Sequence, residues 1–126
     1  RQGYEYPNIF GITACETAYR CGEKWLDELL SYVYGNYEYM VDFCRKNMPE
    51  ARISDLQGTY LPWFDMNAYG LSHEELMKRV ENDARIWLDE GTLFGPEGRG
   101  FIRFNIACPR SVVEEAMDRL KAAMEK

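Results

Sequence analysis

Several residue types that mark common functions are scarce in this chain of 126 residues. It has one histidine, His73, which cannot make a zinc site with the other residues present, and no serine–histidine–aspartate set is available with that histidine in a helix turn. We expect His73 in the first turn of a helix. The formal net charge is −6, and an acidic chain lacks the positive field that attracts nucleic acid. No apolar run approaches the roughly 18 residues that cross a bilayer, so we expect neither a nucleic acid nor a membrane as a partner.

Cysteine is present, but not in an arrangement typical of metal or redox sites. The four cysteines form no Cys-x-x-Cys pair and have no histidine nearby: Cys15, Cys21, Cys44 and Cys108. This spacing favours small buried or half-buried thiols in a reducing compartment, so we expect a cytoplasmic protein without a metal site. The first residues, RQGYEYPN, contain neither a signal-peptide core nor an initiator methionine. We therefore expect a piece of a longer chain.

The first half of the chain is predicted to be mainly helical. Hydrophobic residues make up 46% and charged residues 29%, as in an ordinary globular protein with one core. Residues 11–48 lack proline and repeat apolar side chains at helical spacing. Gly35 is expected to kink or divide this helix, and Pro49 to end it. Short strands are predicted at 51–54 and 58–66, with Pro62 at a sheet edge or a non-bonded position.

The second half alternates helices and strands. Ser72 and Glu75 predict a capping box at the start of a helix, and Ser111 and Glu114 predict another before the last helix. Further strands are expected at residues 85–89 and from Phe101 onward. The resulting order is helix, helix, strand, strand, helix, strand, strand, helix. It predicts an α+β domain in which a small, largely antiparallel sheet is covered by helices.

A glycine-rich segment, EGTLFGPEGRG, occupies residues 90–100. It lacks the Gly-Lys-Ser/Thr of a phosphate-binding loop, and it leads into a strand instead of a helix. A hairpin connection is therefore favoured over a nucleotide site. The segment is longer than a hairpin needs, which leaves room for a binding role.

The strand in RGFIRFNIACPR, residues 99–110, has two different faces. Ile102 and Phe104 alternate with Arg103 and Asn105, so the apolar pair points one way and the polar pair the other. Arg103 stands among apolar neighbours and is unlike a simply solvated side chain. Two interpretations remain open: a structural salt bridge, or a two-pronged clamp on a carboxylate. Asn105, on the same face, is expected to support such a clamp.

Taken together, these motifs resemble a known family. The stretches NIFGITACETAYRCGEKWLDELLSYVYGNYEYM, GTYLPWFDM and DEGTLFGPEGRGFIRFNIACPRSVVEEAMDRL cover nearly the whole chain. They resemble the C-terminal third of pyridoxal-phosphate (PLP) enzymes of fold type I. The resemblance is to the MalY/PatB subfamily, the cystathionine β-lyase-like C–S lyases within the class I/II aminotransferases. It implies a linking helix from a large domain over residues 1–34 and a small C-terminal domain over 35–126.

The resemblance also implies a site and a function. The family's Arg-x-Asn strand motif matches Arg103 and Asn105, which implies that Arg103 binds the substrate's α-carboxylate. The matched loop at the substrate entrance comprises Gly91, Thr92, Leu93, Phe94 and Gly95. The implied activity is that of a C–S β-lyase acting on a sulfur-containing amino acid. An aminotransferase is the alternative, and a free-standing regulatory module that binds small molecules is an alternative of another class.

The family's cofactor-holding lysine, in a Ser-x-x-Lys context, has no counterpart in this chain. The lysines all lie in or beside predicted helices without that context: Lys24, Lys46, Lys78, Lys121 and Lys126. We therefore expect PLP in the full-length protein but none bound to this segment, which alone should be inactive and hold no catalytic residue. The implied partners are the large domain of the same chain and a second subunit of a homodimer. An exposed apolar surface is expected along residues 10–33, where these would pack.

Overall fold

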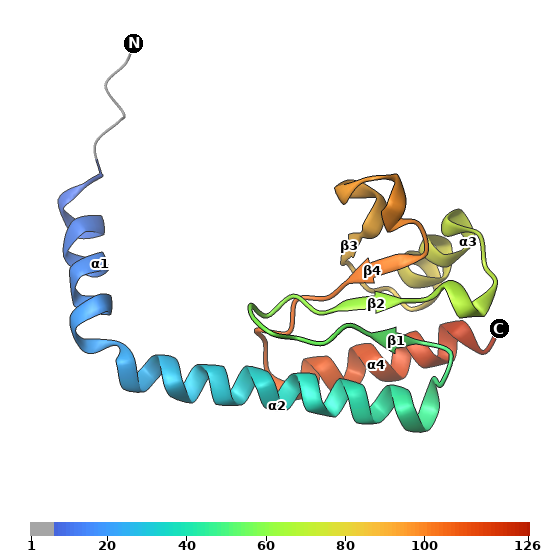
Figure 1. The fold of residues 1–126 in the computed structure, drawn as a ribbon, viewed down its shortest axis with the longest axis horizontal. Helices are drawn as coiled ribbons and strands as arrows, with labels where there is room; N and C mark the ends of the chain where they lie inside the picture. The colour runs from blue at the N-terminus through green and yellow to red at the C-terminus, as the bar shows by residue number, and fades with distance from the viewer. Residues whose placement is uncertain (1–6) are drawn as a thin grey trace, which may run out of the picture. The chain divides into compact units, whose positions relative to one another are not determined.

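The computed structural model describes residues 7–126. Its helices are α1 (Ile9–Cys21), α2 (Glu23–Asn47), α3 (His73–Lys78) and α4 (Arg110–Met124) (Figure 1). Its strands are β1 (Arg52–Ile53), β2 (Trp63–Asp65), β3 (Asp89–Glu90) and β4 (Phe101–Arg103). The chain divides into two compact units, one reaching to Tyr32 and one comprising Val33–Lys126. The domain boundary expected from the family resemblance, between a linking segment (1–34) and a small domain (35–126), stays a prediction.

The helical first part of the chain is broken at Gly22, not at Gly35. Asn8 caps α1 by accepting a hydrogen bond from the Gly11 N–H (2.7 Å). At the other end, a Cβ on Gly22 would lie 2.4 Å from the Ala18 carbonyl oxygen, so only glycine fits there. The predicted division at Gly35 is wrong, because α2 runs through it unbroken. Gly35 instead provides close packing, since a Cβ there would lie 3.3 Å from Nη2 of Arg110.

The four strands form one antiparallel sheet in the order β1-β2-β4-β3, which confirms the predicted α+β class. Phe64 of β2 pairs with Ile102 of β4, and Trp63 pairs with Arg103. Pro62 lies directly before β2, an internal strand, where its carbonyl accepts a hydrogen bond from Phe104 (3.1 Å). The prediction of an edge or non-bonded position for Pro62 is therefore wrong. Since proline cannot return the bond, the regular pairing begins only at Trp63.

Two predicted strands are shorter than expected. The strand expected at 58–66 is reduced to β2, and the one at 85–89 is replaced by β3. Thr59 (φ 66°) and Arg85 (φ 55°) both adopt left-handed backbone conformations, which interrupt an extended chain. Before Arg85 the chain is still helical, because a π-helical turn over Arg79–Asp83 follows α3. These local backbone states leave no room for the longer strands.

The core lies between the sheet and two helices. Phe64 and Ile102 of the sheet, together with Met40 of α2 and Met117 of α4, are fully buried. Figure 1 shows α4 lying beside α2 along one side of the sheet. The rings of Phe64 and Phe104 pack with their centroids 4.7 Å apart. This packing directs the opposite face of β4, which carries Arg103, away from the core.

Only one of the two predicted capping boxes is present. Ser72 accepts a hydrogen bond from the Glu75 N–H, and the Glu75 carboxylate accepts one from the Ser72 N–H (3.0 Å). The prediction for Ser111 and Glu114 is wrong. The last helix already begins at Arg110, after Pro109 in the N-cap position, and has no side-chain cap. Its start is set by the preceding proline, which places Ser111 inside the helix.

Among the residues that the structure describes, no helix is both long and apolar enough to cross a membrane.

Candidate substrate-binding site around Arg103

Arg103 lies at the end of β4, between two side chains that the sheet register places beside it. Its Cα partners are Trp63 on β2 and Asp89 on β3. Both Nη2 (2.7 Å) and Nε (3.2 Å) donate hydrogen bonds to Oδ2 of Asp89. The structural salt bridge, one of the two interpretations left open by the sequence, is therefore present. The side chain of Arg103 is 21% exposed and that of Asp89 46% exposed, so the pair faces a partly open surface.

The salt bridge uses only one edge of the guanidinium. Nε and Nη2 share one oxygen of Asp89, which accounts for the side edge of the group. Among residues 7–126, no hydrogen-bond acceptor contacts the other edge, formed by Nη1 and the second N–H of Nη2. A planar guanidinium can donate two parallel hydrogen bonds from that edge to a carboxylate. The salt bridge and a second carboxylate can therefore be accommodated together.

Two aromatic rings lie close to the guanidinium of Arg103. Cζ of Arg103 lies 4.2 Å from the centroid of the Phe94 ring and 5.8 Å from that of Trp63. The two rings contact each other edge to face, with centroids 5.1 Å apart. Cation–π contacts of this kind restrict a guanidinium without consuming its donors. Phe94 comes from the predicted entrance loop, so the structure brings that loop and the predicted arginine together.

The glycine-rich segment is folded as two short 3₁₀ turns, Gly91–Phe94 and Pro96–Gly98. They touch through their backbones, because a Cβ on Gly91 would lie 2.1 Å from the Gly98 carbonyl oxygen. Gly95, with φ 134°, adopts a conformation that other residues rarely reach. The segment joins the paired strands β3 and β4, so the predicted hairpin connection is confirmed. Within it, Leu93 and Phe94 are exposed.

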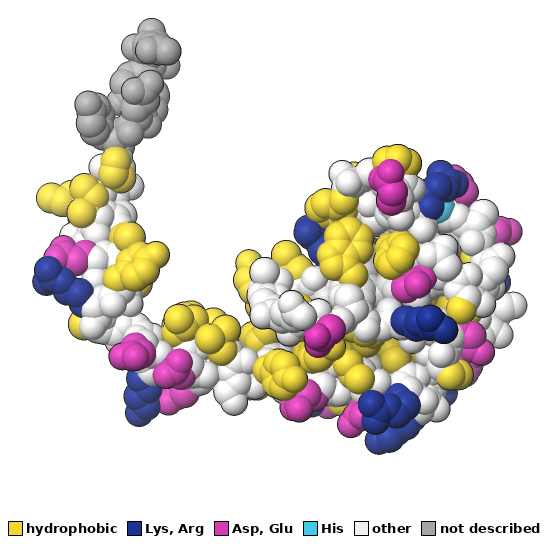
Figure 2. All heavy atoms as spheres, in the orientation of Figure 1, with side chains coloured by type: hydrophobic (Ala, Val, Ile, Leu, Met, Phe, Trp, Pro, Cys, Tyr) yellow, Lys and Arg dark blue, Asp and Glu magenta, His cyan; other side chains and the backbone are white. Residues whose placement is uncertain are grey.

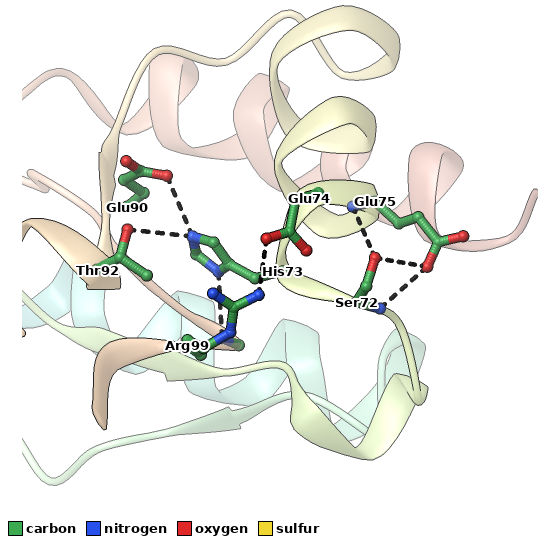
Figure 3. A network of polar contacts seen from close by, with 8 residues as sticks. Ser72, His73, Glu74, Glu75, Glu90, Thr92 and Arg99 are labelled. Atoms are coloured by element: carbon green, nitrogen blue, oxygen red, sulfur yellow. Dashed lines mark hydrogen bonds and ion pairs between the residues drawn. The ribbon is translucent and has the colours of Figure 1, made fainter. Parts of the chain in front are cut away.

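His73 fastens this loop to α3 (Figure 3). Its Nδ1 accepts a hydrogen bond from the N–H of Gly100 (3.2 Å). The proton of the neutral ring therefore belongs on Nε2, which faces the Glu90 carboxylate (3.1 Å) and the Thr92 hydroxyl (3.3 Å). The predicted place of His73 in the first helical turn is confirmed. Its role as a loop anchor was not predicted, since its partners are 17 to 27 positions away.

Asn105 does not contact the guanidinium of Arg103. It is exposed, and its Oδ1 accepts a hydrogen bond from the N–H of Ala107 (3.0 Å). Asn105, Arg103 and Asp89 nevertheless line the same cavity, of about 290 Å³, whose walls include Phe104 and Ile106. The predicted supporting role of Asn105 stays a prediction, because the described contact shapes only the backbone after β4.

The cysteines are free thiols of two kinds. Cys44 is buried, and burial raises its pKa to about 12; burial also raises the pKa of Cys108, which is half-buried. Cys15 and Cys21 are exposed, so the expectation of buried or half-buried thiols is wrong for these two. They lie on α1, where no described residue is buried. Within residues 7–126, no group of three or more His, Cys, Asp or Glu side chains is placed to bind a metal ion.

Comparison with known proteins identifies what this fold and site resemble. No family model matches the chain. Cystathionine β-lyase PatB of Bacillus subtilis is 37% identical over 124 residues, which cover 98% of this chain and 32% of that protein. Protein MalY of Escherichia coli is 34% identical, covering 93% of this chain and 30% of its own. The structure of cystalysin from Treponema denticola, which contains PLP, superposes with a TM-score of 0.89 at 36% identity, covering 94% of this chain and 30% of its own.

These likenesses first define a class. The fold is that of the α+β C-terminal domain of PLP-dependent transferase-fold proteins. Within this class, the chain belongs to the MalY/PatB family of cystathionine β-lyases and corresponds to its C-terminal domain. It spans about a third of the length of the curated relatives that it matches.

The lysines of the chain do not fit a covalent site for PLP. Four are exposed and Lys121 is half-buried, and all five lie in helices or at the C-terminus. Lys24, Lys121 and Lys126 are engaged in ion pairs on the surface, at N–O distances of 3.8, 3.6 and 3.2 Å. A lysine that forms a Schiff base instead needs an environment that favours its neutral amine. None of these lysines therefore lies in surroundings suited to attaching the cofactor.

Proposed function

We propose that this chain is the C-terminal domain of a PLP-dependent C–S β-lyase that acts on sulfur-containing amino acids. In this proposal Arg103 binds the substrate's α-carboxylate, and the loop from Gly91 to Gly95 borders the substrate entrance. PLP supplies the electron sink of such reactions, while the protein binds and orients the substrate. The family membership supports the activity, and the open edge of the Arg103 guanidinium is the observation that carries the site.

The surroundings of Arg103 suit a carboxylate ligand. A hydrogen-bonded ion pair strengthens when water is partly excluded, and the arginine is only 21% exposed. Phe94 and Trp63 restrict the guanidinium, so less conformational entropy is lost when a ligand binds. The neighbouring cavity offers apolar walls for the remainder of a substrate. These features together favour an amino acid over a free inorganic anion.

The remaining expectations for the full-length protein belong to the same proposal. It is expected to be a cytoplasmic homodimer with PLP bound outside this chain, and this chain alone to be inactive. Residues 1–34 would then link a large domain to the small domain formed by 35–126. Apolar side chains along the linking segment would pack against the large domain or the second subunit.

The proposal is tested by replacing Arg103 in the full-length protein. Arg103→Met should lower kcat/KM for sulfur amino acids by roughly a hundredfold, as expected when a bidentate charged pair is lost. Arg103→Lys should be impaired too, because an ammonium cannot form the fork. Arg99→Met is the matched control, since Arg99, in the glycine-rich segment, forms an exposed ion pair with Glu74 of α3 (2.7 Å). Unchanged kcat/KM in Arg103→Met would remove this residue from the site.

The geometry of Arg103 serves an aminotransferase equally well. The two activities are separated by their products, since a lyase releases a thiol and ammonia while an aminotransferase passes the amino group to a keto acid. A free-standing binding module is tested by calorimetry on residues 1–126 with amino acids. Stoichiometric binding there would favour the module, and its absence would favour a domain that needs the rest of the protein.

A further inference from the structure

We infer that Asp89 is a positioning residue for Arg103. It holds the edge formed by Nε and Nη2, so that a substrate carboxylate can bind only to the adjacent edge, formed by Nη1 and the second N–H of Nη2. This inference rests on the proposed role of Arg103 and extends it to a second residue. Asp89 does not touch the substrate in this arrangement; it acts through the arginine.

The sheet register fixes the contact between Asp89 and Arg103. Asp89 and Arg103 are Cα partners on the paired strands β3 and β4, so their side chains leave the same face of the sheet side by side. Two donors of Arg103 converge on a single oxygen of Asp89, at 2.7 and 3.2 Å. This convergence defines the plane and the rotation of the guanidinium and not merely its position.

The aromatic contacts complete the restraint. Cζ of Arg103 lies 4.2 Å from the centroid of the Phe94 ring and 5.8 Å from that of Trp63, which is on the other neighbouring strand. Asp89 occupies the edge of Nε and Nη2, and the two rings lie close to the group, so the edge of Nη1 and Nη2 is the approach that remains among the described residues. Arginine has many rotamers, so a side chain held in this way binds with a smaller loss of entropy.

The exposure of the pair argues against a mainly stabilising role. Asp89 is 46% exposed and Arg103 21% exposed. Ion pairs that remain in contact with water contribute little to folding. The loss of Asp89 should therefore leave the fold intact and affect how a carboxylate binds. A matched carboxylate is Asp83, which forms an ion pair with Lys126 (3.2 Å) at a similar exposure of 37%.

The test compares Asp89→Ala and Asp89→Asn in the full-length PLP-loaded protein. Asp89→Ala should raise KM for a sulfur amino acid about tenfold, as expected for losing a hydrogen bond to a charged group, with kcat less affected. Asp89→Asn should recover most of the loss, because its amide oxygen still accepts from Nε and Nη2. The α-carboxamide of the same amino acid should be insensitive to Asp89→Ala, since it brings no carboxylate to the arginine. Asp83→Asn serves as the control.

Crystal structures of the two variants provide a readout that does not depend on activity. The Arg103 guanidinium should keep its place in Asp89→Asn and lose it in Asp89→Ala. An unchanged KM in Asp89→Ala, or equal losses with the acid and the carboxamide, would overturn the inference. A rise in KM in Asp89→Asn as large as that in Asp89→Ala would also overturn it. If Arg103→Met has no effect, the proposed function itself fails; if only the Asp89 variants have none, Asp89 alone is excluded.

Discussion

At the scale of single residues, Asn36 connects α2 to the chain after β4 and to the start of α4. It is fully buried in α2, and its Nδ2 donates hydrogen bonds to the carbonyls of Ile106 (2.9 Å) and Cys108 (3.0 Å). Its Oδ1 accepts a hydrogen bond from Nε of Arg110, at the start of α4 (2.7 Å). The amide group of Asn36 therefore provides hydrogen bonds to two backbone carbonyls after β4 and also positions Arg110, the first residue of the last helix.

Replacing Asn36 with alanine should be strongly destabilising. The change removes the side-chain donor of two carbonyls and one hydrogen-bond acceptor of Arg110, which should lower the free energy of unfolding by about 3 kcal/mol. Denaturant titration of the variant measures this loss. Asn47→Ala is the control, because the exposed Asn47 bonds only to Phe43 one turn earlier (3.0 Å). Similar losses in both variants would show that burial of Asn36 is not what matters.

Single residues also show how much of the candidate site could be predicted from the sequence. The alternation in β4 was sufficient to predict that Arg103 shares a face with Asn105 and points away from Ile102. The partner of Arg103 was not predictable, because Asp89 becomes its neighbour only through the pairing of β3 with β4. For the same reason the three partners of His73 were missed, since they depend on how the loop folds back onto α3 (Figure 3).

At the scale of the element, the N-terminus of α3 combines a capping box with two acidic residues. The pKa of Glu75 is lowered by hydrogen bonds from the Ser72 hydroxyl and the Ser72 N–H. The pKa of Glu74 is lowered by a backbone hydrogen bond and then by the one from Arg99. A depressed carboxyl pKa means that the stabilisation exists above the unfolded-state pKa and is lost as the pH falls. This helix start should therefore weaken in acid.

Ser72→Ala should lower the free energy of unfolding by about 1 kcal/mol at neutral pH, as is usual for the loss of a helix N-cap. The difference from the unmodified chain should shrink at an acidic pH below the lowered pKa of Glu75, where its protonated carboxyl can no longer act as a charged acceptor. Denaturant titrations at the two pH values measure both effects. Ser111→Ala is the matched control and should change little, because Ser111 forms no cap. A large effect of Ser111→Ala would contradict the assignment of the helix start.

The elements that were predicted correctly are those with local signals. Ser72 and Glu75 are three residues apart, and their hydrogen bonds need no distant partner. The strands at 58–66 and 85–89 were overestimated, since nothing in their apolar pattern reveals the left-handed backbone at Thr59 and Arg85. The choice between Gly22 and Gly35 as the helix break likewise depended on tertiary contact, because Gly35 is held in α2 against Arg110.

At the scale of the whole molecule, the apolar side chains near the N-terminus are uncovered. Large apolar residues of α1 and early α2 are at least 48% exposed: Ile9, Phe10, Ile12, Tyr19, Trp25, Leu26 and Leu30. Figure 2 shows such side chains in yellow along this part of the chain. No described residue of α1 is buried. The expectation of exposed apolar side chains along residues 10–33 is thereby confirmed, and such a surface is typical of a segment that packs against another partner.

The isolated chain should bind a dye that is specific for hydrophobic surface. Replacing Phe10, Tyr19 and Trp25 together with serine should reduce the dye signal and leave the free energy of unfolding of residues 33–126 unchanged. Trp87→Ser is the control, because Trp87 is fully exposed but lies outside this segment. Dye fluorescence and denaturant titration measure the two effects, and sedimentation shows whether the chain is monodisperse. A monodisperse chain without dye binding would contradict the expectation.

The alternation of inward and outward side chains along β4 restricts where residues can be inserted into this segment. One residue inserted between Gly100 and Ile102 would shift the following residues by one position, so that the arginine would point to the buried face, in the place of Phe104, and Ile102 would point outward in the place of the arginine. Two inserted residues would restore the facing but move Arg103 out of register with Asp89 and Trp63. Relatives that keep this site should therefore differ in length only before Gly100 or after the strand, and an alignment gap inside it would mark a protein that recognises its substrate by other means.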